Sequence, residues 1–198
     1  MRPEGNYTRD EIAAILYRVT NHEYEKPFSL SGTVFRDVPD TNWAVFEIEY
    51  MADKGVILGY PEGDYRPSGE LTRAEFAAMI YRFTGVDEYT VKNPFTDLDE
   101  TYWAYKEILS IANSGLVVGY EDGTFRPDDN ISRSEVMTIM NRLLGRNPLD
   151  SYVKELEVNP ITDLTKDLWC YATVLEATIT HNYYLNKNGF EYKWEDVK

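Results

Sequence analysis

Residues 55–75 read GVILGYPEGDYRPSGELTRAE, and residues 115–135 read GLVVGYEDGTFRPDDNISRSE. These two stretches belong to a longer repeat, because residues 35–85 align with residues 95–145 at a constant offset of 60 without a gap. The positions that recur include Phe35, Asp37, Trp43, Ala44, Ile48, Ala52, Gly55, Gly59, Tyr60, Gly63, Arg66, Pro67, Arg73, Glu75 and Arg82. A repeat of this length predicts a fold in which one small structural unit is used several times.

Two incomplete copies flank this pair. Residues 2–18 match residues 66–82 at an offset of 64, and residues 162–169 match residues 96–103 at an offset of 66. We therefore predict one domain over residues 1–198. It consists of the second half of a repeat (1–20), two complete repeats (35–85 and 95–145), the first half of a repeat (161–180) and a C-terminal hairpin extension (181–198). Polar connectors are expected at residues 20–34, 86–94 and 146–160.

The first half of each repeat predicts a helix that begins near Thr41 or Thr101. It should end at Gly55 or Gly115, because glycine takes the positive φ of a helix end with the least strain. The residues of its predicted buried face have helical spacing, and they are Ala44, Ile48, Met51 and Ala52 in one copy and Ala104, Ile108, Ile111 and Ala112 in the other.

The second half of each repeat predicts a helix with a capping box. In this motif a hydroxyl and a glutamate three residues later satisfy each other's backbone N–H groups. The three boxes are Thr8 with Glu11, Thr72 with Glu75 and Ser132 with Glu135. In the first of these helices, the apolar stripe is Ile12, Ile15, Leu16 and Val19.

The C-terminal end departs from the repeat. Asn188-Gly189 lies between aromatic, alternating segments, which favours a β-hairpin. One interpretation of the last unit is that Thr8–Val19 and Thr162–Ala177, from the two chain ends, meet to complete it. The alternative is that residues upstream of Met1 complete the first repeat, and the sequence leaves both open.

Composition excludes several classes of protein. The 198 residues carry a net charge of −14, which argues against general binding to nucleic acid or to an anionic membrane. Cys170 is the single cysteine, so neither an intramolecular disulfide nor a cysteine-based zinc framework can form. The only histidines, His22 and His181, do not recur, and the sequence shows no hydrolase triad, phosphate-binding loop or metal-ligand quartet. We therefore expect no catalytic activity, no cofactor, no metal site and no membrane insertion.

Arginines and tryptophans at repeated positions are the candidate binding residues. Arg9, Arg73 and Arg133 follow the helix caps, where a cation is unfavourable by up to about 1 kcal/mol. Either an ion pair with a repeated acid (Asp37, Asp97 or Asp163) or an anionic ligand at the helix start could favour them there. Trp43, Trp103 and Trp169 could pack in the core or present the indole face to a sugar ring.

The order Phe-x-Asp, Trp-Ala, Gly-Tyr-x-x-Gly, Arg-Pro and Thr/Ser-Arg-x-Glu resembles the S-layer homology family. The last element corresponds to that family's Thr-Arg-Ala-Glu signature, and the resemblance covers residues 2–19, 35–85, 95–145 and 161–178. It implies a mainly α-helical domain with helix-loop-helix repeats in a pseudo-threefold arrangement, to which this chain adds a short C-terminal β-hairpin.

The resemblance also implies a function. Grooves between such repeats bind the secondary cell-wall polysaccharide of Gram-positive bacteria, often through a pyruvate ketal, whose carboxylate suits an arginine. The implied binding residues are Arg9, Arg73, Arg133, Trp43, Trp103, Trp169, Asp37, Asp97, Gly59 and Gly119. We expect an extracellular fragment of a longer exported protein, located in the cell wall or S-layer. We also expect Arg73→Ala and Arg133→Ala to weaken wall binding while helix content stays intact.

The main alternative function is a protein–protein or self-assembly module of a surface layer, with other surface-layer proteins as partners and no glycan bound. Dependence of binding on wall carbohydrate separates the two functions.

Overall fold

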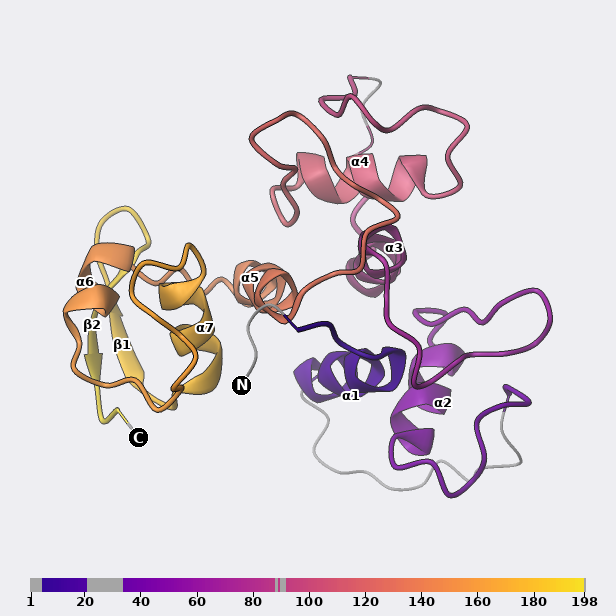
Figure 1. Cartoon of the computed structure of the whole chain (residues 1–198), viewed down its shortest axis with the longest axis horizontal. Coiled ribbons are helices and arrows are strands. Elements are labelled where there is room, and N and C mark those ends of the chain that lie inside the picture. The colour runs from indigo at the N-terminus through magenta and orange to yellow at the C-terminus, as the bar shows by residue number, and fades with distance from the viewer. Residues whose placement is uncertain (1–4, 21–33, 88, 90–91, 198) are drawn as a thin grey trace. The chain divides into compact units, whose positions relative to one another are not determined.

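The computed structural model describes residues 5–20, 34–87, 89 and 92–197. Their secondary structure is mainly α-helical with one antiparallel hairpin, which confirms the predicted class (Figure 1). The elements are α1 (Arg9–Val19), α2 (Val45–Asp53), α3 (Arg73–Thr84), α4 (Tyr105–Asn113), α5 (Arg133–Leu143), α6 (Asp150–Glu155), α7 (Tyr171–Thr178), β1 (Asn182–Leu185) and β2 (Glu191–Glu195).

The chain divides into two compact units. The central unit is Tyr7–Ile131, and the terminal unit is Met1–Asn6 with Ser132–Lys198. The predicted single domain, its repeat boundaries and the pseudo-threefold arrangement stay predictions.

The capped helices begin where the sequence predicts. Thr8, Thr72 and Ser132 are the N-caps of α1, α3 and α5, and all three capping boxes are present. Because the box is a contact between residues three apart, it forms independently of distant packing.

The first helix of each repeat begins later than predicted. The helix α2 starts at Val45 because the residues from Thr41 onward form turns, in which Asn42 N donates to Pro39 O at 2.8 Å and Asn42 Oδ1 accepts from Ala44 N at 2.8 Å. The predicted ends are confirmed, since Gly55 and Gly115 have φ of 69° and 78°.

Most of the predicted buried face is confirmed. The side chains of Ala44, Ile48 and Met51 are buried, as are those of Ala104, Ile108 and Ile111, while Ala52 and Ala112 are only half-buried.

Each helix that begins with a capping box packs on the helix that follows the next repeated tryptophan in the chain. Contacts join α1 to α2, α3 to α4 and α5 to α7. At the first pair, the Tyr17 ring meets Phe46 and Tyr50 edge-on, with centroids 5.3 and 5.1 Å away. At the third, Asn141 Nδ2 donates to Thr173 O at 3.0 Å. Each of these three pairs lies within one unit. The meeting of Thr8–Val19 with Thr162–Ala177 stays a prediction.

One backbone hydrogen bond occurs at the start of three helices. Arg9 N donates to Gly69 O at 2.9 Å, and Arg73 N donates to Asp129 O at 2.9 Å. Within the terminal unit, Arg133 N donates to Gly5 O at 2.7 Å. Gly5, Gly69 and Asp129 occupy equivalent positions of the repeat, so equivalent carbonyl groups accept from the first N–H groups of α5, α1 and α3.

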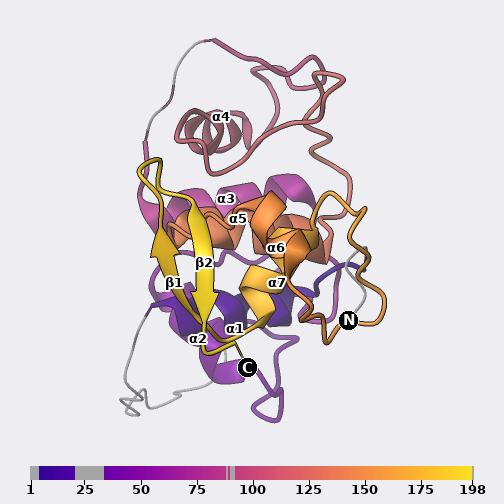
Figure 2. The same ribbon diagram turned by 90° about the vertical axis from the view of Figure 1, so that its left-hand side faces the viewer.

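The terminal unit contains a helix that the sequence analysis missed. The predicted connector 146–160 includes α6, whose Val153 is fully buried and belongs to a cluster with residues of α7. The hairpin prediction is confirmed: β1 pairs with β2 around Asn186–Phe190, with Gly189 at φ 79° (Figure 2).

The other two connectors differ in how far they are described. Residues 21–33 lie outside the described range, whereas the described residues of 86–94 form neither helix nor strand. In the described part of the chain, no helix is both long and apolar enough to cross a bilayer.

Candidate functional site

Arg9 is buried at the start of α1 between two tyrosine rings. Its side chain is 4% exposed, and its guanidinium lies 4.9 Å from the Tyr60 ring centroid and 4.8 Å from that of Tyr65. Nε donates to Tyr65 O at 2.7 Å, and Tyr65 Oη donates to Arg9 O at 2.6 Å. The guanidinium is therefore held in one orientation.

Glu75 completes this cluster. Arg9 Nη1 and Tyr60 Oη both donate to Glu75 Oε1, at 2.9 and 2.7 Å. The other oxygen, Oε2, accepts at 2.9 Å from the backbone N–H of Thr72, the N-cap residue of α3. The acid that pairs with Arg9 is thus a capping-box glutamate and not Asp37, one of the three aspartates considered as partners of the repeated arginines. Burial, and then the bond to Glu75, raise the pKa of Tyr60 above its ordinary value.

The same geometry recurs at Arg73. Its side chain is buried, its Nε donates to Phe125 O at 2.8 Å, and its guanidinium lies 4.8 Å from the centroids of both Tyr120 and Phe125. Arg133, in the terminal unit, is half-buried.

Asp37 and Asp97 bind backbone instead of arginine side chains. The Asp37 carboxylate accepts from the N–H groups of Tyr65 and Arg66, both at 2.7 Å. Asp97 accepts from Phe125 and Arg126, also at 2.7 Å. Two hydrogen bonds thus hold the turn in place at Arg66 and Arg126, whose positive φ of 60° and 56° is unfavourable for a residue other than glycine.

Gly59 and Gly119 are required by close packing. A Cβ on Gly59 would lie 2.5 Å from Phe35 Cε1 and 2.6 Å from Asp64 O, and one on Gly119 would meet Phe95 and Thr124 O as closely. These glycines let the Gly-Tyr turn lie directly on the phenylalanine of its own repeat.

Replacing Gly59 by alanine should lower the free energy of unfolding by about 1–3 kcal/mol, because Asp64 O is fixed by Tyr60 N and cannot withdraw. Urea denaturation followed by circular dichroism measures the loss. Gly119→Ala should show a similar loss, and Glu62→Ala, an exposed change in the same turn, should show little. Equal stability of Gly59→Ala and the parent chain would contradict the packing argument.

The repeated tryptophans lie on the surface. The exposed fractions of Trp43, Trp103 and Trp169 are 59%, 57% and 61%. Trp43 Nε1 donates to Asp10 Oδ2 at 2.8 Å. Of the two predicted roles for these side chains, core packing is therefore excluded, since more than half of each side chain is exposed.

Trp103 borders a cavity of about 660 Å³ in the central unit. The cavity lies among the Gly59-Tyr60 turn, one side of α3 and the segment before α4, and its lining residues are Arg9, Leu58, Gly59, Tyr60, Pro61, Thr72, Glu75, Met79, Arg82, Tyr102, Trp103, Glu107 and Asp128. We call it the Trp103 pocket.

Charge in the Trp103 pocket is mixed. Arg82 Nη1 donates to Val56 O at 2.9 Å, and burial lowers the pKa of this guanidinium. Tyr102 Oη donates to Asp128 Oδ1 at 2.7 Å. The walls thus offer oriented donors and acceptors beside an exposed indole, a combination suited to a polar ligand with one apolar face.

The structure brings only part of the predicted site together. Arg9, Gly59 and Trp103 share one pocket, whereas Arg73 and Gly119 belong to the second copy of the arginine cluster. Asp37 and Asp97 stabilise turns and do not line the Trp103 pocket.

Several polar side chains that line this pocket were not among the predicted ligand-binding residues. They include Tyr60, Glu75, Arg82 and Tyr102. The first three recur 60 positions later as Tyr120, Glu135 and Arg142, so recurrence was a signal that could have found them.

Comparison with known proteins gives the family. The sequence model of the S-layer homology domain matches residues 34–77 and 94–137. The chain belongs to the S-layer homology family. Both matches end just after a capping box, and each contains the Asp, Trp and Gly-Tyr positions described above.

Relatives match well beyond these two segments. A cellulosome-anchoring protein of Acetivibrio thermocellus is 35% identical over 99% of this chain, and an S-layer protein of Bacillus licheniformis is 32% identical over 70%. An endoglucanase of a Bacillus species is 33% identical over 54% of the chain. The chain spans 44%, 15% and 11% of these three proteins, so each relative has long regions outside the match.

Proposed function

We propose that this chain anchors a protein to the bacterial cell surface by binding an anionic wall polysaccharide in the Trp103 pocket. The observation that carries the proposal is the exposed Trp103 indole beside the buried Arg9–Tyr60–Glu75 cluster. An indole face offers apolar area to one side of a sugar ring, while the neighbouring polar groups can bind its hydroxyl and carboxylate groups.

Local arginines must attract an anionic glycan, because the net charge of −14 repels it at long range. Backbone carbonyls orient both guanidiniums of the pocket: Tyr65 O holds Arg9 and Val56 O holds Arg82. A carboxylate such as that of a pyruvate ketal fits this chemistry, and Glu107 and Asp128 suit sugar hydroxyls as acceptors. The half-buried Arg133 and the exposed Trp43 and Trp169 extend the proposal to the other repeats.

An anchoring role places the chain outside the cell, in the wall or S-layer, as part of a longer exported protein. The names of its relatives support this, since they include an anchoring protein and an S-layer protein. The match to an endoglucanase covers 11% of that enzyme, which supports a separate, non-catalytic module.

Co-sedimentation with purified Gram-positive cell walls tests the proposal. We expect the chain to pellet with intact walls and to stay in solution after acid extraction of the secondary polysaccharide. Trp103→Ala should lower the affinity at least tenfold, which corresponds to about 1.4 kcal/mol, and should leave circular dichroism unchanged because the ring is mostly exposed.

Tyr184→Ala is the matched control, since this exposed aromatic side chain lies on β1 and not in the pocket. Equal binding by Trp103→Ala and Tyr184→Ala would exclude the Trp103 pocket. Pelleting that survives extraction would instead favour a protein–protein module, the second candidate, which the three exposed indoles also suit.

A further inference from the structure

His181 has one ring nitrogen committed to backbone and one directed at carboxylates. Its side chain is 3% exposed, and its ring stacks on Trp194 with centroids 3.9 Å apart. Nδ1 lies 2.8 Å from Ile179 O. Because a carbonyl oxygen can only accept, Nδ1 carries the hydrogen, and the lone pair of the neutral imidazole is on Nε2.

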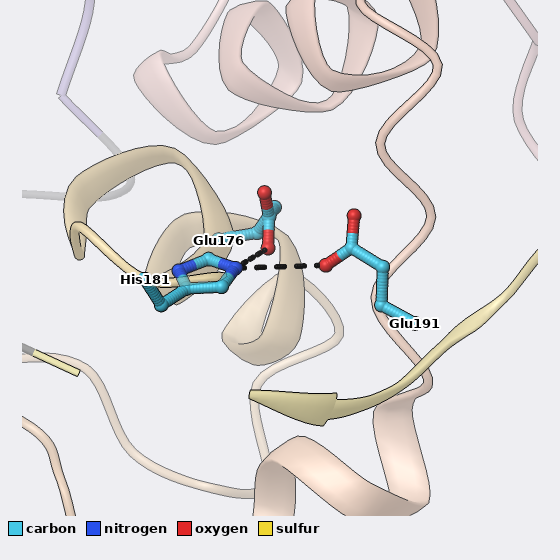
Figure 3. A group of neighbouring side chains, drawn as sticks. All are labelled: Glu176, His181 and Glu191. Carbon is cyan, nitrogen blue, oxygen red and sulfur yellow. Dashed lines mark ion pairs between the residues drawn. The ribbon is translucent and has the colours of Figure 1, made fainter. Parts of the chain in front are cut away.

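Two buried glutamates face this lone pair. Glu176 Oε2 lies 2.9 Å from His181 Nε2, and Glu191 Oε2 lies 3.6 Å from it (Figure 3). The side chains of Glu176 and Glu191 are 1% and 0% exposed. Among the described residues, His181 Nε2, Glu176 Oε2 and Glu191 Oε1 have no hydrogen-bond partner. Three groups that can all act as acceptors thus lie close together, and the Glu191 oxygen nearest to His181, Oε2, also accepts from Trp194 Nε1.

The cations that face the two carboxylates are Arg146 and, when it is protonated, His181. Arg146 Nε lies 3.8 Å from Glu176 Oε1, but 42% of the Arg146 side chain is exposed. Buried carboxylates need a paired cation or a bound metal.

We propose that Glu176, His181 and Glu191 bind a divalent transition-metal ion of the zinc class. One imidazole nitrogen and two carboxylate oxygens are ligands that such ions accept. Ligands about 2.0–2.2 Å from one ion lie about 3–4 Å from each other, and the three ligand atoms here lie within 4.8 Å of one another.

Further groups hold the proposed ligands in place. Ile179 O fixes the His181 ring, and Trp194 Nε1 donates to Glu191 Oε2 at 3.0 Å. Such outer contacts are usual around metal-binding imidazoles and carboxylates. An adjoining cavity of about 230 Å³ leaves room for water as a further ligand. Calcium fits poorly, because it takes six to eight oxygen ligands.

The ion would join β2 to the end of α7. The sequence predicts no metal site because the ligands follow no recognised spacing: Glu176 belongs to α7, His181 follows that helix, and Glu191 begins β2. This proposal is independent of wall binding.

The test uses the full chain, freed of metal by a chelator and dialysed. Calorimetric titration with ZnCl₂ should show one ion bound per chain, and CoCl₂ should give visible ligand-field bands. At an ion concentration of 100 times Kd, Tm should rise by roughly 5–10 °C. Glu176→Gln and His181→Gln should each weaken binding at least tenfold, whereas Glu155→Gln, which changes an exposed acid of α6, should bind as the parent chain does.

Absence of one-to-one Zn²⁺ and Co²⁺ binding by the parent chain would overturn the proposal, whatever the variants do. Unchanged binding by folded Glu176→Gln and His181→Gln, checked by circular dichroism, would overturn the assigned ligands. Equal affinity for CaCl₂ would overturn the assigned class of ion.

Discussion

Replacing Arg9 by methionine should lower the free energy of unfolding by about 2–4 kcal/mol. Removing one member of a buried ion pair typically costs 3–5 kcal/mol because its partner keeps an uncompensated charge. We expect less here because the Glu75 side chain is 18% exposed and water can reach it. Loss of a cation from the helix start returns up to about 1 kcal/mol. Methionine keeps most of the side-chain volume between Tyr60 and Tyr65.

Urea denaturation of the full chain, followed by circular dichroism, measures the change. Arg36→Met is the matched control: Arg36 also pairs with an acid, Asp64, but its side chain is 65% exposed, and we expect little change. Adding Glu75→Gln to Arg9→Met should recover part of the loss, because glutamine removes the unpaired charge and can still cap Thr72 N. Equal losses in Arg9→Met and Arg36→Met would show that burial of the pair is unimportant.

Arg73 is more important for stability than its position in the sequence indicates. Because it follows a helix cap, where a cation is unfavourable, the sequence predicts that Arg73→Ala leaves the helix content intact. In the structure, the Arg73 side chain is buried between two aromatic rings and donates from Nε to Phe125 O, as Arg9 donates to Tyr65 O. Weaker wall binding by Arg73→Ala could therefore result from a less stable fold as well as from a lost contact with the ligand. Trp103→Ala tests the pocket more directly, because the Trp103 side chain is mostly exposed.

Local features of the fold could be predicted from sequence. A capping box joins residues three apart, and a glycine with positive φ ends a helix wherever its neighbours are, so Thr8, Thr72, Gly55 and Gly115 act as predicted. The helix α6 escaped prediction because its six residues are too few for a clear apolar period and bury chiefly Val153.

Contacts between distant residues could not be predicted. Glu75 lies 66 positions from Arg9, and several repeated acids were equally plausible partners. The choice depends on which carboxylate oxygens are left for a side chain. Both oxygens of Asp37 accept from N–H groups of a turn, whereas Glu75 binds backbone through Oε2 alone and its Oε1 faces Arg9. Tryptophan exposure was also open, because Trp43 and Trp103 precede their helices and helical spacing does not apply there.

Replacing Asp37 by alanine should lower the free energy of unfolding by about 2–4 kcal/mol. Its carboxylate accepts from Tyr65 N and Arg66 N, and each hydrogen bond to a charged group contributes about 1.5–3 kcal/mol. Without these hydrogen bonds, less remains to offset the strain of the positive φ at Arg66. Asp37→Asn keeps one acceptor oxygen, so its loss should be intermediate.

Thermal and urea denaturation of Asp37→Ala, Asp97→Ala and Asp40→Ala test this role. Asp97 makes the same two contacts in the next repeat and should show a similar loss, whereas Asp40 is exposed and should show little. A stable Asp37→Ala would mean that the turn holds its own shape.

Asp37→Ala should also affect the proposed binding site. The Arg66 guanidinium lies 3.9 Å from the centroid of Tyr60, which lines the Trp103 pocket. Asp37→Ala should therefore weaken wall binding even at temperatures where the chain stays folded, although Asp37 does not line the pocket. Wall binding equal to that of the parent chain under those conditions would show that the turn supports the fold but not the pocket.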